Sequence, residues 1–150
     1  MIKILFVCYG NICRSPMAEF ILKDMVNKKG VNDKFLIESR ATSTEELGND
    51  IYYLAKEKLK EKNIPFTKRN VIKLDKNDYE KYDYIIGMAD YNIDDILDII
   101  GKDKDNKVYK LLEFVGSNSD IDDPWYTRDF ETAYNEIYQG CIGLLKSLNY

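Results

Sequence analysis

Histidine is absent from this 150-residue sequence. Its absence excludes catalytic Ser-His-Asp and Cys-His pairs, and it excludes zinc sites with histidine ligands. Any catalytic side chain must therefore be a cysteine, a carboxylate, a lysine, an arginine or a tyrosine.

Cysteine is also scarce, with only Cys8, Cys13 and Cys141. An odd number of cysteines argues against a disulfide scaffold. No apolar run approaches the roughly 20 residues that cross a bilayer, and the short apolar N-terminus lacks a small-residue cleavage site. We therefore expect a cytoplasmic protein whose cysteines are mostly reduced.

No excess of positive charge is present, since the net charge is −4 and the basic residues are scattered. This distribution is atypical of proteins that bind nucleic acid or lie on a membrane surface, and we expect neither partner. The composition is 45% hydrophobic and 32% charged, which is ordinary for a globular protein. The length fits one domain, over residues 1–150.

Strand and helix patterns alternate along the chain. Short apolar runs predict strands at 4–8, 35–37, 84–88 and 108–112. Apolar residues three and four positions apart predict helices around 18–25, 49–62, 93–100 and 134–148. Cys141 lies on the apolar face of the last of these helices. This order predicts a single α/β domain, Rossmann-like, with a mostly parallel four-stranded sheet and helices on both faces.

The loop after the first strand is where a ligand is expected, because such folds bind ligands at the carboxyl ends of their strands. The strand ends at Cys8, and the loop runs to Pro16. Ser15 suits the N-cap of the next helix and Pro16 its first position. A helix N-terminus offers free N–H groups and a partial positive charge, which favour an anion.

The residues inside this loop suit phosphate chemistry. Gly10 and Asn11 tolerate left-handed backbone angles, so successive N–H groups can turn inward and form an anion nest. Arg14 can add a bidentate fork for two phosphate oxygens. The same positive field favours the thiolate of Cys8, which can attack a bound phosphoryl group. The Gly-x-x-x-x-Gly-Lys-Ser/Thr loop of nucleotide-binding proteins is absent.

A phosphatase needs a proton donor for the departing oxygen, and without histidine a carboxylic acid is the natural donor. Asp122 and Asp123 precede Pro124 in a predicted turn, and such a loop can carry an acid over a pocket. Trp125 and Tyr126 follow and can pack against a flat aromatic substrate. A surface turn with two solvated aspartates is the alternative for this segment by itself.

The segment Val7–Glu19, in which five residues separate Cys8 from Arg14 and Ser15-Pro16 follows, resembles the low-molecular-weight protein tyrosine phosphatase family. The resemblance implies the phosphotyrosine phosphatase I type of α/β fold. It also implies hydrolysis of phosphotyrosine and small aryl phosphates through a phosphocysteine intermediate, with no metal or other cofactor. The family's acid is the residue just before proline, which corresponds to Asp123.

The resemblance also implies the remaining site residues. The partners expected are a phosphotyrosine-containing protein and, in the loop, phosphate or another oxyanion. Ser15 is expected to hydrogen-bond the Cys8 sulfur and Asn11 to fix the loop backbone. Cys13 is either a packed side chain or a thiol that traps oxidised Cys8 as a disulfide. The expected catalytic residues are Cys8, Arg14 and Asp123, and the expected substrate-binding residues are Tyr9, Gly10, Asn11, Ile12, Cys13, Ser15, Trp125 and Tyr126.

Other activities of related folds stay open. A sister branch acts on phosphoarginine and tends to have threonine where this chain has Ile12, which favours tyrosine. Related arsenate reductases need further redox cysteines on a mid-chain helix, and residues 15–140 contain none. A phosphocarrier of a sugar-uptake system also has a cysteine after its first strand, but it needs no acid. An inactive phosphate-binding module is the remaining alternative.

Three positions depart from the family pattern. Glu45 stands where the family's second pocket loop often presents an aromatic residue. Ala89 interrupts a common Met-Asp pair after Met88, so the role of that aspartate has no counterpart. Thr127 replaces a glycine that often follows the two aromatic residues, which affects loop geometry more than chemistry.

Overall fold

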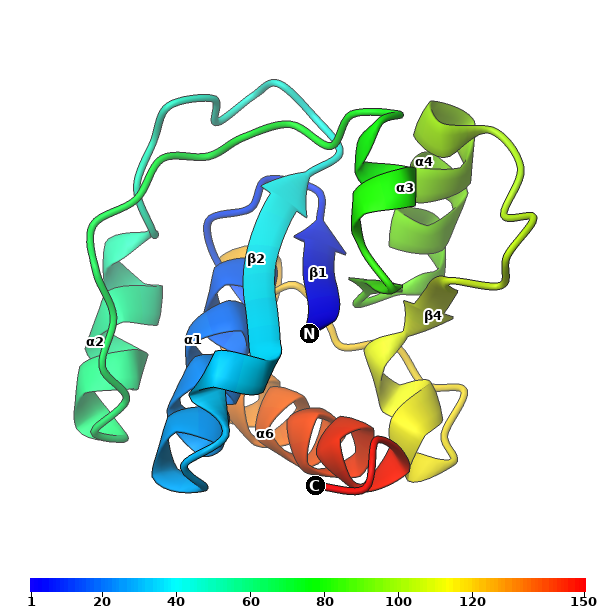
Figure 1. Cartoon of the computed structure of the whole chain (residues 1–150). Helices are drawn as coiled ribbons and strands as arrows, with labels where there is room; N and C mark the ends of the chain where they lie inside the picture. The colour runs from blue at the N-terminus through cyan, green and yellow to red at the C-terminus, as the bar shows by residue number, and fades with distance from the viewer.

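The computed structural model describes residues 1–150 and contains one parallel sheet in the order β2-β1-β3-β4 (Figure 1). The strands are β1 Ile2–Cys8, β2 Phe35–Ala41, β3 Tyr84–Gly87 and β4 Val108–Lys110. The helices are α1 Arg14–Lys28, α2 Tyr53–Glu61, α3 Asp78–Lys81, α4 Asp90–Ile100, α5 Pro124–Thr127 and α6 Phe130–Ser147, with short 3₁₀ helices η1 Asn32–Lys34 and η2 Leu111–Val115. None of the helices combines the length and the apolar character that a membrane crossing requires.

Both faces of the sheet are covered, as the continuous apolar run of β1 predicts. Ile4 and Phe6 belong to the larger core cluster, to which α1, α2 and α6 contribute. Leu5 and Val7 point to the opposite face and pack in a smaller cluster that includes Ile96 of α4. Figure 1 shows α3 and α4 on one side of the sheet and α1, α2 and α6 on the other. The predicted fold class is confirmed.

The end of β1 lies at the switch point of the strand order, because the chain passes from β1 to β2 on one side and then returns to β3 and β4 on the other. β1 pairs in parallel with β2 on one side, where Cys8 is opposite Ala41, and with β3 on the other, where Val7 is opposite Gly87. The carboxyl ends of these strands therefore meet around Cys8, where such sheets bind ligands. At Gly87 a Cβ atom would lie 2.9 Å from a methyl group of Ile93, so glycine allows α4 to approach this end of the sheet.

The predicted helix over 49–62 begins later, at Tyr53. The residues just before Tyr53 use their backbone N–H groups in hydrogen bonds outside the helix. The N–H of Ile51 donates to the side chain of Asp50, and the N–H of Tyr52 donates to the carbonyl of Ile12 at 2.9 Å. Apolar spacing alone therefore placed the start of α2 too early.

The predicted strand over 108–112 is wrong beyond Lys110. Leu111 and Leu112 are buried, but they begin η2, which packs against α6. The carboxylate of Glu113 accepts a hydrogen bond from the N–H of Lys110 at 2.5 Å and caps this turn. Gly116 ends it in a left-handed conformation. A short apolar run fits a strand or a buried helical turn equally well.

Candidate active site

The Cys8 loop, defined as residues 8–15, connects β1 to α1 and sits at the carboxyl edge of the sheet. The helix begins at Arg14 with Cys13 in the N-cap position, so the prediction that Ser15 is the N-cap is wrong. Pro16 is accordingly the third helical residue and not the first, two positions further into the helix than predicted. The reason is that the Ser15 hydroxyl faces back into the loop and lies 2.9 Å from the Cys8 sulfur.

A chain of hydrogen bonds orients that hydroxyl. Arg69 donates through Nη2 to the backbone oxygen of Asn11 at 2.6 Å and to its side-chain oxygen at 2.5 Å. The side-chain nitrogen of Asn11, Nδ2, then donates to the hydroxyl oxygen of Ser15 at 2.6 Å. Because arginine can only donate, this direction leaves the Ser15 proton for the sulfur of Cys8. Sequence reasoning predicted the Ser15 and Asn11 contacts but missed Arg69.

The loop backbone also turns toward the sulfur. Asn11 adopts a left-handed conformation, with φ of 58°, and its N–H lies 3.3 Å from Cys8 Sγ. Gly10 is not left-handed, so the tolerance predicted for that position is not used. One left-handed residue suffices to bring an N–H group into the concave side of the loop.

Arg14 is almost fully buried at the bottom of the site. One guanidinium nitrogen, Nη1, donates to the carbonyl of Ile121 at 3.0 Å. The other, Nη2, donates to the hydroxyl of Tyr91 at 2.5 Å and lies 3.4 Å from Asp123 Oδ2. Burial by itself lowers the pKa of Arg14, but the neighbouring Cys8, Asp123 and Tyr91 raise it overall. The guanidinium is thus a fixed positive charge beside the thiol.

Tyr91 contacts Arg14 from the segment in which Ala89 departs from the family pattern. The Ala89 methyl group is buried and offers no oxygen, but two residues later the Tyr91 hydroxyl accepts from Arg14 and the Tyr91 ring lies 5.5 Å from the guanidinium carbon. Asn92 adds a longer contact of 3.5 Å. The sequence held no signal for this contact between Tyr91 and Arg14, because it depends on where α4 begins.

Asp123 caps the short helix α5. Its Oδ1 accepts from the N–H of Trp125 at 3.0 Å, and its Oδ2 faces Arg14. The Asp123 side chain is 21% exposed and lines the same pocket as Cys8, whereas Asp122 is exposed and does not. The geometry therefore favours Asp123 over Asp122 as the carboxylate of this site.

One pocket brings the separate segments together. The pocket has a volume of about 60 Å³ that the centres of water molecules can occupy. This volume is several times what one water molecule needs. The predicted residues around it are Cys8, Tyr9, Gly10, Asn11, Ile12, Cys13, Arg14, Asp123, Trp125 and Tyr126. Ser15, the last residue of the loop, is fully buried and does not line the pocket. An anion in this pocket would meet the thiol, the guanidinium and the carboxylate at once.

Two acidic residues complete the pocket, Glu45 and Glu46. Glu45 accepts a hydrogen bond from the Tyr9 hydroxyl at 2.9 Å. This bond, together with burial and the negative charge of Glu45, raises the pKa of Tyr9. Glu45 therefore holds the Tyr9 ring in place as one wall.

Cys13 and Cys141 are chemically quieter thiols. Burial raises the pKa of Cys13 well above its usual range, and Cys8 and Asp123 raise it further. Burial does the same for Cys141, which is fully enclosed in the core as predicted. Both thiols are therefore protonated at neutral pH.

Comparison with known proteins places the chain among phosphatases. Residues 3–150 match the family described as low molecular weight phosphotyrosine protein phosphatase. The low molecular weight protein-tyrosine-phosphatase YfkJ of Bacillus subtilis is 36% identical over 150 residues, 99% of this chain and 96% of the relative. PtpA of Staphylococcus saprophyticus, also named a low molecular weight protein-tyrosine-phosphatase, is 38% identical over 97% of this chain and 92% of its own length.

Solved structures agree. The crystal structure of YfkJ superposes with a TM-score of 0.95 and covers 99% of this chain and 95% of that one. The structure of a Drosophila arginine phosphatase superposes with a TM-score of 0.90 at 26% identity, over 99% of each chain. With the family match over nearly the whole chain, these likenesses confirm the resemblance of the Cys8 loop: the chain belongs to the low molecular weight phosphotyrosine protein phosphatase family.

Proposed function

We propose that this protein is a tyrosine phosphatase that removes phosphate from phosphotyrosine in proteins, with Cys8 as nucleophile, Arg14 as phosphate ligand and Asp123 as general acid. The supporting observation is that these three residues, separated by up to 115 positions, line one pocket. Family membership independently supports a phosphoprotein substrate.

In the first step the Cys8 thiolate attacks phosphorus. The S–P bond forms as the bond between phosphorus and the tyrosine oxygen breaks, and Asp123 gives its proton to that oxygen. The products are neutral tyrosine and a phosphocysteine. Asp123 lines the same pocket as Cys8, and the tyrosine oxygen that it protonates departs on the side of phosphorus opposite the Cys8 sulfur.

In the second step water attacks the phosphocysteine. Asp123, now a carboxylate, takes a proton from the water as the new P–O bond forms, and the S–P bond breaks to return the Cys8 thiolate. Ser15 stabilises that thiolate through its hydroxyl. Inorganic phosphate then leaves. Arg14 and the loop N–H groups stabilise the charge on the phosphoryl oxygens in both steps.

Phosphotyrosine is the substrate that the walls of the pocket favour. Tyr9, Trp125 and Tyr126 all line it, and aromatic side chains suit the flat ring of phosphotyrosine. Ile12 also lines it, where the phosphoarginine-specific branch tends to have threonine. A location in the cytosol and the absence of nucleic-acid partners remain predictions, as does a protective disulfide between Cys8 and Cys13.

The non-enzymatic alternatives fit less well. A phosphocarrier needs no proton for a leaving alcohol, so it gives no reason for a partly buried Asp123 beside Arg14. An inactive binding module gives no reason for a Ser15 proton directed at the Cys8 sulfur.

Hydrolysis of p-nitrophenyl phosphate by the wild type and by Cys8→Ser tests the proposal. We expect the serine variant to lose at least about 10⁴-fold in kcat. Turnover that persists in this variant contradicts the mechanism. Parallel assays with a phosphotyrosyl peptide and a phosphoarginyl peptide decide the substrate, and a preference for phosphoarginine contradicts the assignment to tyrosine.

A further inference from the structure

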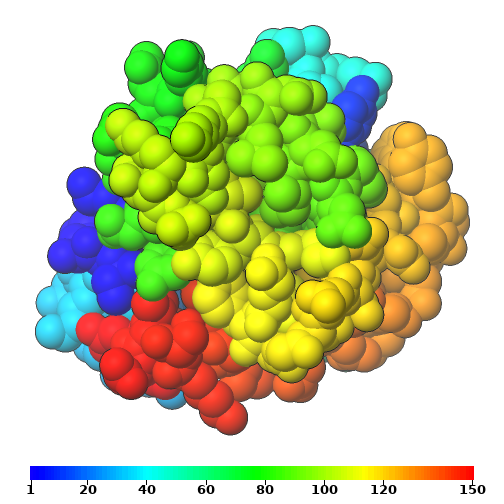
Figure 2. Space-filling view, turned by 90° about the vertical axis from the view of Figure 1, so that its right-hand side faces the viewer, coloured from blue at the N-terminus to red at the C-terminus, as the bar shows by residue number.

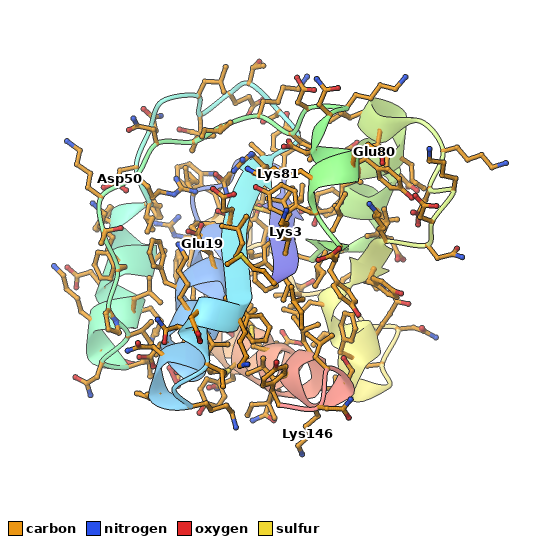
Figure 3. The ribbon with its side chains drawn as sticks, viewed as in Figure 1. Lys3, Glu19, Asp50, Glu80, Lys81 and Lys146 are labelled. Carbon is orange, nitrogen blue, oxygen red and sulfur yellow. The ribbon has the colours of Figure 1, made fainter.

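Tyr52 contacts the two loops that carry Cys8 and Asp123, although it does not line the pocket itself. It stands just before α2, and its N–H donates to the carbonyl of Ile12 at 2.9 Å. Its backbone is thereby tied to the Cys8 loop. Asp50, labelled beside α2 in Figure 3, supports the same segment by accepting hydrogen bonds from the N–H groups of Ile51 and Arg69.

The side chain of Tyr52 reaches in the other direction, to the Asp123 loop, defined here as residues 120–128. The Trp125 ring meets the Tyr52 ring edge-on, with centroids 4.7 Å apart. Phe130, the first residue of α6, stacks on the Tyr52 ring at 6.2 Å. The ring of Tyr52 therefore contacts residues at the start of α5 and at the start of α6.

Arg128 closes this arrangement. It ends α5 in a left-handed conformation, with φ of 61°. Its Nη2 donates to the Tyr52 hydroxyl at 2.8 Å, and its Nη1 donates to the Trp125 carbonyl at 3.0 Å. The guanidinium carbon also lies 5.5 Å and 5.8 Å from the Tyr52 and Trp125 ring centroids. The bond to Tyr52 is the main reason that the pKa of Arg128 is raised.

From Trp125 the path to Asp123 is a single hydrogen bond. The Trp125 N–H donates to Asp123 Oδ1 at 3.0 Å, and this leaves Oδ2 beside Arg14. A displacement of Trp125 rotates the carboxylate and moves Oδ2 away from the leaving oxygen. A general acid that is misplaced by a fraction of an ångström to 1 Å loses much of its effect.

The other end of the Asp123 loop has separate supports. The N–H of Ile121 donates to the Met88 carbonyl at 2.9 Å, and the ammonium group of Lys110 contacts Asp120 at 3.0 Å. Neither support touches Trp125. The part of the loop that follows Asp123 is exposed except at Pro124, so its position depends on the contacts of Trp125 and Arg128 with Tyr52.

We propose that Tyr52 is a positioning residue that sets the orientation of the Asp123 carboxylate relative to the Cys8 loop, acting through Trp125 and Arg128. This inference rests on the proposed function, since it assumes that Asp123 is the general acid. It assigns Tyr52 a part in leaving-group protonation and none in phosphate binding.

The test is the dependence of kcat/KM on the leaving group in Tyr52→Ala. The substrates run from p-nitrophenyl phosphate, whose leaving group needs little help, to phenyl phosphate, whose leaving group needs a proton. Since general acid catalysis is worth about 10²–10⁴-fold, we expect a loss of roughly 10- to 100-fold with phenyl phosphate and of less than about 3-fold with p-nitrophenyl phosphate. The inhibition constant of inorganic phosphate should change by less than about 2-fold, because Arg14 and the loop amides are untouched.

Two further variants keep the test decisive if Tyr52→Ala does not fold. Tyr52→Phe keeps the ring contacts and removes the acceptor of Arg128, and Arg128→Ala removes the donor. Both should steepen the leaving-group dependence by a smaller factor, and the double variant should add little to either single variant. Tyr138→Ala on α6 is the matched control, because Tyr138 packs against Tyr134 and not against the Asp123 loop.

An equal loss with all substrates in the Tyr52 variants, or an unchanged leaving-group dependence in Tyr52→Phe and Arg128→Ala, overturns this role. A steeper dependence in Tyr138→Ala as well overturns it too, because the effect would then be general. Failure of the proposed function is a different observation, namely turnover by Cys8→Ser.

Discussion

The loops that carry the proposed nucleophile and the proposed acid are held in different ways. In the Cys8 loop, Cys8, Asn11 and Ser15 hydrogen-bond one another within eight residues, and Arg69 and Tyr52 hydrogen-bond the loop backbone from outside. The Asp123 loop is supported from outside, by Tyr52 on one flank and Lys110 on the other. The groups around the proposed nucleophile are thus oriented largely within one short segment, whereas the proposed acid is oriented through contacts with distant elements.

The two loops also differ in how exposed their side chains are to solvent. Residues from Asn11 to Ser15 are all buried, whereas Trp125 and Tyr126 are 41% and 79% exposed. In Figure 2 the segment that carries them, in orange, lies at the rim of the molecule. A segment with few buried contacts opens at a lower free energy than a buried one. The comparison predicts that changes in the Cys8 loop affect every substrate, while changes in the Asp123 loop affect substrates selectively.

Arg14→Lys should have the largest effect among changes that spare the nucleophile. Lysine keeps the charge but cannot form a fork to two phosphate oxygens, and it loses the bonds to Ile121 and Tyr91. We expect a loss of about 10³-fold in kcat/KM for both phenyl and p-nitrophenyl phosphate. A loss confined to phenyl phosphate would contradict the uniform effect expected of the Cys8 loop.

Asp123→Asn should slow poor leaving groups by about 10²–10³-fold and p-nitrophenyl phosphate much less. Asp122→Asn is the matched control and should change either rate by less than about 3-fold, since Asp122 is exposed and outside the pocket. A larger effect in the control would assign the acid to Asp122.

Ser15→Ala removes the hydroxyl between Cys8 and Asn11. We expect kcat to fall by about 10- to 100-fold for all substrates, the rate equivalent of one hydrogen bond to a charged group. The free energy of unfolding should fall by about 1–3 kcal/mol, because the buried Asn11 amide loses its acceptor. Kinetics and chemical denaturation measure both effects, and a wild-type kcat would remove Ser15 from the mechanism.

Lys110→Met should have the smallest effect on rate. The buried ammonium bonds Asp90, Asp120 and the Asn118 carbonyl, but both carboxylates are partly or mostly exposed and are solvated when it is gone. We expect a loss of about 1 kcal/mol in the free energy of unfolding and a change in kcat below about 3-fold. A change in leaving-group dependence as large as that of Tyr52→Ala would show that both flanks position Asp123.

The same contrast explains what the sequence could predict. The Cys8 loop was identified as a site because Cys8, Asn11, Arg14 and Ser15 lie within one short segment. Asp123 was found through the Asp-Pro turn, and the family resemblance selected it over Asp122. The misplaced N-cap at Ser15 has a physical cause, since a serine that bonds a neighbouring sulfur is not available to cap the helix.

Supports that come from distant elements could not be predicted. Arg69 lies in an irregular polar stretch, and only the folded chain brings it to Asn11. Tyr91 takes the contact with Arg14 because α4 begins at Asp90. Tyr52 was assigned to the interior of a helix, although its N–H is bonded to Ile12. In each case a long-range contact decides the role, and local sequence patterns do not encode it.

The most direct test of the account is to trap the phosphoryl group during turnover. Rapid acid quenching of the wild type during turnover of a phosphotyrosyl peptide, followed by peptide mapping, should find phosphate on Cys8 alone. The phosphocysteine should then decay, with release of inorganic phosphate, at the rate of the second step. Phosphate on another residue, or single-turnover release of phosphate with no phosphorylated enzyme, would contradict transfer to the Cys8 sulfur.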